Sequence, residues 1–190
     1  MAHTHHHEDT QPPRHEHGAA ACCGSESCAA SAAPAFRSGR AYKILPVQAP
    51  PYFIVIDHAL RDEGTSYHYL PPSDYSVADA HLAQIAREAL MAAGVSVQVG
   101  ATWTTDAPFR ETHEAIDVAA QAGILAVEME AAALYAFAKA RGRPVLCFAH
   151  VTNQMGRIEG DFEKGVADGA EQSLKVISLA AGRWRAERPS

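Results

Sequence analysis

Residues 126–138 read AVEMEAAALYAFA, and this stretch decides the fold class predicted for the chain. A short apolar run at residues 124–127 is typical of a buried strand. It leads directly into a helix that is predicted to begin at Glu128, Met129 and Glu130 and to end at Gly142. A strand that passes straight into a helix is characteristic of α/β proteins.

The same alternation continues on both sides of this stretch. Further strands are predicted at residues 52–56, 95–103 and 145–151, where apolar and β-branched residues are concentrated. Helices are predicted between Asp79, as N-cap, and Gly94, then at residues 112–122 and 162–185. The pattern predicts a layered α/β domain with a mixed central sheet flanked by helices.

Residues 1–40 differ in composition from the rest of the chain. The first part is rich in His, Pro and charge, and the second is a low-complexity run of small residues. Neither part can bury a hydrophobic face, so we predict a disordered tail at residues 1–40 and a folded domain at 41–190. The spacing of the tail's possible metal ligands matches no defined zinc site, so no specific metal site is predicted, and loose metal binding is the alternative. These ligands are His3, His5, His6, His7, His15, His17, Cys22, Cys23 and Cys28.

The overall composition excludes several classes of protein. The 190 residues carry a net charge of -6, which argues against a general nucleic-acid surface or a basic membrane-binding patch. No apolar run reaches the ~18 residues needed to span a bilayer. The polar, His-rich N-terminus is unlike a secretory signal, and the four cysteines form no disulfide framework. A reducing cytoplasm is the compartment expected from these features.

Polar residues at three predicted strand ends are the candidate site residues. The carboxylates of Glu128 and Glu130 either cap a helix or, in one case, accept hydrogen bonds from two vicinal hydroxyls such as those of ribose. Trp103, with Thr105 beside it, either packs in the core or offers an aromatic face to a planar ligand. Asn153 is either a turn residue or a donor and acceptor for a base.

Taken together, these motifs resemble the nucleoside phosphorylase and uridine phosphorylase family. The resemblance rests on VEMEAAALYAFA, on VGATWTTD before it, on the VTN strand end after it, and on RDEGTSYHYLPPS and EGDFEKG. It covers residues 53–179. It implies phosphorolysis of a purine nucleoside or uridine to the free base and ribose 1-phosphate, with inorganic phosphate as co-substrate, no other cofactor, and homo-oligomeric assembly.

The resemblance also implies roles for individual residues. Met129 and Glu130 would hold the ribose, with Glu128 beside them. Trp103 would face the base, and Val127 would line the base pocket. Asn153 stands where some purine-cleaving members place an Asp, and an amide cannot donate a proton as a general acid. This departure argues against broad purine cleavage by acid catalysis and leaves 6-oxopurine nucleosides and uridine as the expected substrates.

The second departure concerns phosphate. Family members carry Gly-rich strand ends with Arg, and Arg37 and Arg40 lack that glycine pattern, so no phosphate-binding residue is predicted. The chain therefore resembles a member without its phosphate-binding part, with unpaired sheet edges as the expected consequence. A nucleoside-binding protein without activity, or a nucleosidase that uses water, are the alternatives. His150 is expected to be a core residue, and His68 to lie near a subunit boundary.

Overall fold

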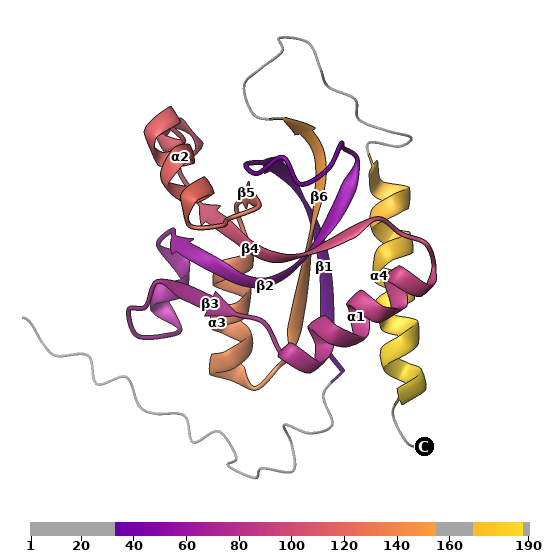
Figure 1. Ribbon diagram of the computed structural model, residues 1–190. Coiled ribbons are helices and arrows are strands. Elements are labelled where there is room, and N and C mark those ends of the chain that lie inside the picture. Colours follow the sequence, from indigo (N-terminus) through magenta and orange to yellow (C-terminus); the bar gives the residue numbers. More distant parts are fainter. Residues whose placement is uncertain (1–32, 155–168, 188–190) are drawn as a thin grey trace, which may run out of the picture.

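The computed structural model describes residues 33–154 and 169–187, and it confirms the predicted α/β fold with a mixed sheet. Strands and helices alternate through most of the chain (Figure 1). The elements are β1 (Ala35–Lys43), β2 (Tyr52–Asp62), η2 (Thr65–His68), β3 (Tyr75–Val77), α1 (Ala80–Ala92), β4 (Val97–Thr105), η3 (Pro108–Arg110), α2 (His113–Gln121), β5 (Ala126–Glu128), α3 (Ala131–Arg141), β6 (Val145–Gln154) and α4 (Ala170–Glu187).

The sheet closes on itself. Its strand order is β3-β2-β4-β5-β1-β6, and β6 also pairs antiparallel with β2. In the described part of the chain, five strands therefore form a ring, and only the three-residue β3 is attached outside it, at β2. The expectation of unpaired edges was wrong for the described strands of the ring, because the β2–β6 pairing satisfies the backbone groups that an open sheet would expose.

The prediction of a disordered tail up to residue 40 was also wrong at its C-terminal end. Residues 35–40 belong to β1, which lies between β5 and β6 in the ring. The sequence FRSGR lacks the apolar alternation that predicts a strand, and β1 is instead held by parallel pairing with β6 along its whole length. Residues 1–32, with the possible metal ligands of the tail, lie outside the described residues.

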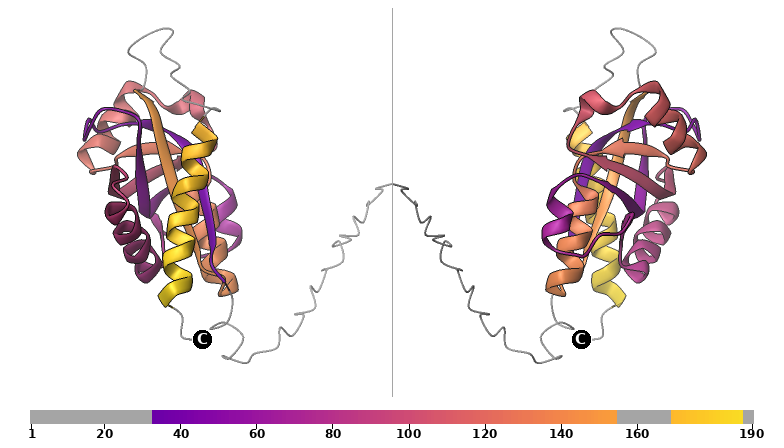
Figure 2. Two further views of the ribbon diagram at one scale, coloured as in Figure 1. Left: turned by 90° about the vertical axis from the view of Figure 1, so that its right-hand side faces the viewer. Right: turned by 90° about the vertical axis from the view of Figure 1, so that its left-hand side faces the viewer.

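Helices cover the ring from several directions. Helix α3 packs on one cluster of buried residues with β2 and β6, whereas α1 and α4 lie side by side over a second cluster on other faces of the same strands (Figures 1 and 2). Helix α2 covers a third cluster, which includes Trp103 and Val127. His150 is buried and stacks on Phe53 with ring centroids 4.3 Å apart, which confirms its predicted place in the core.

The predicted helix boundaries hold where a cap sets them. Asp79 accepts a hydrogen bond from the Leu82 amide, and Thr112 accepts one from the Ala115 amide. Gly142 ends α3 with a φ of 58°, a left-handed conformation that glycine adopts without strain. Helix α3 begins at Ala131, later than predicted, and the predicted start of the last helix at residue 162 falls outside the described residues. No helix in the described part of the chain could cross a membrane.

A buried tyrosine ties α3 to two strands of the ring. The Tyr135 hydroxyl donates to the Ile56 carbonyl at 2.6 Å and accepts from the Cys147 amide at 3.1 Å, and burial raises the pKa of Tyr135 well above its usual value. Tyr135→Phe leaves both backbone groups without this partner, so we expect a loss of about 1–3 kcal/mol in the free energy of unfolding. Urea denaturation measures it.

Tyr67→Phe is the matched control, because the Tyr67 hydroxyl donates to the Arg61 carbonyl from an exposed ring. Equal losses for the two variants would show that the buried Tyr135 bridge stabilises the fold no more than an exposed hydrogen bond does.

Candidate active site

Glu128, at the end of β5, has its whole carboxylate engaged by the protein. One oxygen accepts hydrogen bonds from the Thr102 and Thr104 hydroxyls on β4, and the other accepts from the amides of Glu130 and Ala131, both at 2.8 Å. The side chain is only 6% exposed. The Glu128 side chain therefore caps α3 and joins this helix to β4. Glu130 occupies the N-cap position, but its side chain makes no capping hydrogen bond.

The environment of Glu128 acts on its pKa in two directions. Burial disfavours the carboxylate and raises the pKa, and the four hydrogen bonds lower it without cancelling the effect of burial. Four hydrogen-bond donors of the described chain therefore stabilise the charged form of the group that holds the start of α3.

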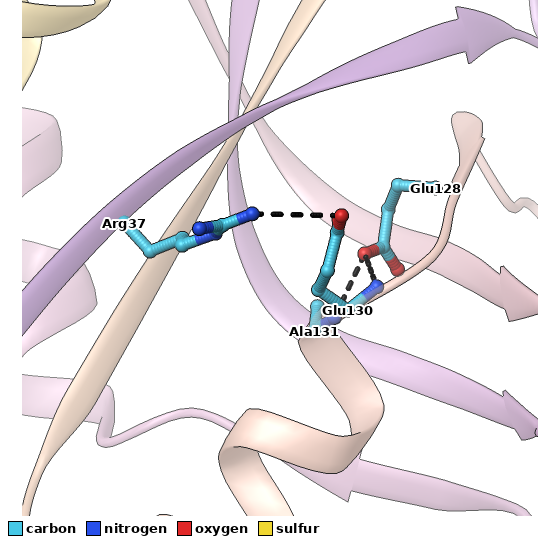
Figure 3. A network of polar contacts seen from close by, with 4 residues as sticks. All are labelled: Arg37, Glu128, Glu130 and Ala131. Carbon is cyan, nitrogen blue, oxygen red and sulfur yellow. Dashed lines mark hydrogen bonds and ion pairs between the residues drawn. The ribbon is translucent and has the colours of Figure 1, made fainter. Parts of the chain in front are cut away.

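Glu130 follows this turn at the N-cap position of α3. Its carboxylate faces Arg37 on β1, with Nη2 of Arg37 and Oε1 of Glu130 separated by 3.5 Å (Figure 3). The side chains are 52% exposed for Arg37 and 43% for Glu130, so both are open to a ligand. The structure brings together a carboxylate and a guanidinium from parts of the chain more than 90 residues apart in sequence.

The alternation of side chains along β1 explains why Arg37, and not Arg40, lies there. Residues two apart in a strand share a face. A Cβ at Gly39 would lie 3.3 Å from Oε2 of Glu130, so Arg37 and Gly39 face α3. Ser38 lies on the other face, where its hydroxyl donates to Ser173 on α4. The sequence did not identify Arg37 as a site residue, because its strand was placed in the disordered tail. The alternation of side chains between the two faces of a strand is the signal that would have identified it.

The two groups line a small pocket between β1, β2, β6 and α3. Its lining includes Arg37, Gly39, Glu128, Glu130 and Cys147. Burial, with Glu128 nearby, raises the pKa of the Cys147 thiol to about 12, so this cysteine is not a nucleophile at neutral pH. No three His, Cys, Asp or Glu side chains in the described ranges are grouped to hold a metal ion.

The other predicted substrate-binding residues are mostly buried. Trp103 is 5% exposed and donates its indole N–H to Asp62 at 3.0 Å, so in this structure it is a core residue. Thr105 and Val127 are also buried, and the Thr105 hydroxyl accepts from the Ala107 amide. Met129 is 49% exposed beside Glu130. Contact of these residues with a base or a ribose stays a prediction.

Asn153 lies in the last part of β6, opposite Tyr42 of β1. It is therefore a strand residue, not a turn residue. Its side chain lies outside the described part of the structure, and its role toward a leaving base stays a prediction.

The family model of the phosphorylase superfamily matches residues 35–181, from the first residue of β1 into α4. The chain belongs to the phosphorylase superfamily. It is also similar to a DeoD-type purine nucleoside phosphorylase of Haemophilus influenzae (strain PittGG), with 36% identity over 80 residues. That match covers 42% of this chain and 34% of the relative, so the chain spans about a third of that protein.

A larger cavity of about 490 Å³ lies at the other end of α3 in this superfamily member. Its lining includes Ala138, Lys139, Arg143 and Asp79, and the Asp79 carboxylate already caps α1. Among the described residues that line this cavity, no carboxylate is paired with a guanidinium, so we assign the candidate site to the smaller pocket at Glu130.

Gly39 leaves only limited room for the Glu130 carboxylate. In Gly39→Ala the new methyl group lies 3.3 Å from Oε2, so the carboxylate has to move by a few tenths of an ångström. Small displacements of a binding group reduce catalytic efficiency, and we expect a loss of about three- to tenfold in kcat/KM for the nucleoside phosphorolysis that we propose. Steady-state kinetics measures it.

Gly182→Ala on α4 is the control, because a Cβ there meets no other atom within 4 Å. Unchanged kinetics for Gly39→Ala would mean that the carboxylate has more freedom than its contacts indicate.

Proposed function

We propose that the chain catalyses phosphorolysis of a nucleoside, giving the free base and ribose 1-phosphate. One observation carries the proposal: the half-exposed Glu130 carboxylate lies 3.5 Å from the half-exposed Arg37 guanidinium in the same pocket. A carboxylate accepts hydrogen bonds from two vicinal hydroxyls, and a guanidinium binds a phosphate oxyanion. Membership of the phosphorylase superfamily and the similarity to a purine nucleoside phosphorylase support the same reaction.

In this proposal Glu130 accepts hydrogen bonds from the 2'- and 3'-hydroxyls of the ribose, and Met129 packs beside the sugar. Arg37 serves as the phosphate-binding residue that the sequence did not identify. Glu128 acts indirectly, because its hydrogen bonds to the amides of Glu130 and Ala131 fix the turn that carries Glu130. Trp103, Thr105 and Val127 form the wall behind the base.

The reaction breaks the bond between C1' and the base nitrogen and forms a bond between C1' and a phosphate oxygen. Positive charge develops on the ribose before the new bond is complete, and the phosphate held by Arg37 and the Glu130 carboxylate both stabilise it. The base leaves with the electron pair of the broken bond and is then protonated. Asn153 can hydrogen-bond that base but cannot protonate it, which favours 6-oxopurine or uracil leaving groups.

The proposal is tested with the purified 190-residue chain, inosine or uridine, and inorganic phosphate. The expected result is release of hypoxanthine or uracil that requires phosphate and yields ribose 1-phosphate. Release without phosphate, with free ribose as product, would instead identify a nucleosidase. Calorimetric binding of the nucleoside without any turnover would identify a binding protein.

We also propose that the chain uses no cofactor besides phosphate, assembles as a homo-oligomer and acts in a reducing cytoplasm. The resemblance to nucleoside phosphorylases supports the first two, and the absence of a disulfide framework in the sequence supports the third. His68 is exposed at the end of η2, as a residue near a subunit boundary would be in the isolated chain. Light scattering of the purified protein tests the assembly.

A further inference from the structure

We infer that the cavity at the C-terminal end of α3 is a second ligand site, which binds a small apolar molecule that carries one negative charge. The cavity has a volume of about 490 Å³, within the range of about 300–1,000 Å³ that is typical of small-molecule sites. Glu130 stands at the other end of α3, so binding in this cavity does not depend on the proposed phosphorolysis.

Apolar side chains from three parts of the chain form the walls of the cavity. Val77 and Ala78 come from the end of β3 and the residue after it, Tyr135 and Ala138 from α3, and Val145 from the start of β6. The Tyr135 hydroxyl is already hydrogen-bonded to two backbone groups, so a ligand can use only the aromatic ring. Val77 is 64% exposed, and an apolar ligand that covers it removes apolar surface from water.

Two cations give the cavity its preference for a negative charge. Lys139 and Arg143 both line it and are exposed, and neither forms an ion pair with another residue that the structure describes. Asp79 also lines the cavity, but one of its oxygens accepts the Leu82 amide at the start of α1. Of the lining side chains that the structure describes, two are therefore positive and one is negative, in a chain whose net charge is -6. An anion is favoured here over a cation.

The walls and the charges together define the class of ligand. An inorganic anion would meet the two cations but leave the apolar walls uncovered, and a neutral apolar molecule would gain nothing from Lys139 and Arg143. An apolar carboxylate does both. Water screens exposed ion pairs, so each cation changes the affinity by only about 1.4- to fivefold. The apolar walls therefore supply most of the binding, and the cations supply the selectivity for an anion.

Calorimetric titration of the full chain with 2-naphthoate tests the site. The neutral probe of the same shape is 2-naphthamide, and acetate is the anion without an apolar body. We expect 2-naphthoate to bind about two- to thirtyfold more tightly than 2-naphthamide, because it meets two exposed cations, and acetate not to displace it at equal concentration. Lys139→Met and Arg143→Met should each weaken 2-naphthoate binding by about 1.4- to fivefold and leave the affinity for 2-naphthamide unchanged.

Arg141→Met is the matched control, because it removes the same charge from the last turn of α3 at a residue outside the cavity lining, and it should bind both probes as wild type does. Arg37→Met, in the pocket at the other end of α3, should also leave 2-naphthoate binding unchanged. Ala138→Leu narrows the cavity and should weaken both probes. Should that variant not fold, the charge variants decide, because Lys139 and Arg143 are exposed.

Three results would overturn the assignment. The first is no binding of either naphthyl probe to wild type, and the second is equal affinity for the charged and the neutral probe. The third is a larger loss of 2-naphthoate affinity in Arg37→Met than in Arg143→Met, which would place the probe in the pocket at Glu130.

Discussion

Glu128→Ala is expected to lower the free energy of unfolding by about 3–5 kcal/mol, the largest effect on stability among the variants considered. The substitution removes the acceptor for four hydrogen bonds inside the protein, two from hydroxyls on β4 and two from amides at the start of α3. The two amides then lie buried or half-buried without a partner. Urea denaturation followed by circular dichroism measures the loss.

Glu128→Gln is the shape-matched control, because it keeps one oxygen for the two amides and an amide group that can donate to the threonine hydroxyls. We expect it to lose about 1–2 kcal/mol. A loss below about 1 kcal/mol for Glu128→Ala would mean that this carboxylate does not hold the turn.

The raised pKa of Glu128 makes this comparison depend on pH. The folded protein binds the proton of Glu128 more tightly than the unfolded chain, whose value is near 4.5. The resulting contribution to stability is fully present below that value and is lost as the pH rises through the folded pKa. Wild type should therefore gain stability relative to Glu128→Gln as the pH falls from 7 towards 5. A difference that does not change over this range would contradict a raised pKa.

Glu130→Ala is expected to reduce kcat/KM for the proposed phosphorolysis by about a hundred- to ten-thousandfold. Two hydrogen bonds from the ribose to a charged acceptor contribute about 1.5–3 kcal/mol each, and both are lost. The free energy of unfolding should change by less than about 1 kcal/mol, because the Arg37–Glu130 pair is half exposed. Initial-rate kinetics with inosine or uridine measures the first effect, and denaturation the second.

The contrast between the two glutamates is the sharpest check on their assigned roles. Glu128→Ala should mainly reduce stability, and Glu130→Ala should mainly reduce activity. Glu114→Ala, at an exposed position in the first turn of α2, should change neither. Activity retained by Glu130→Ala would remove the ribose-binding role from this residue.

Much of the fold was predictable from local patterns. Asp79, Thr112 and Gly142 set helix boundaries through contacts within a few residues, so their effects are visible in the sequence. The buried strands β2 and β6 were also visible, because residues on both faces of each strand are apolar. The VEMEAA stretch identified the two carboxylates of the site from local sequence as well, because a strand end and a helix start meet there.

What the sequence alone determined was therefore the α/β class, the order of most elements and the position of Glu128 and Glu130. Only the tertiary structure decided that FRSGR forms the strand between β5 and β6, that β6 closes the ring on β2, and that Arg37 faces Glu130. The physical reason is that β1 is held by backbone pairing with residues of β5 and β6 that lie 83 to 111 positions later in the chain, whereas its segment FRSGR has no apolar alternation. Glu128 and Glu130 differ in role for a related reason. The threonines that donate hydrogen bonds to Glu128 come from β4, and the arginine that faces Glu130 comes from β1.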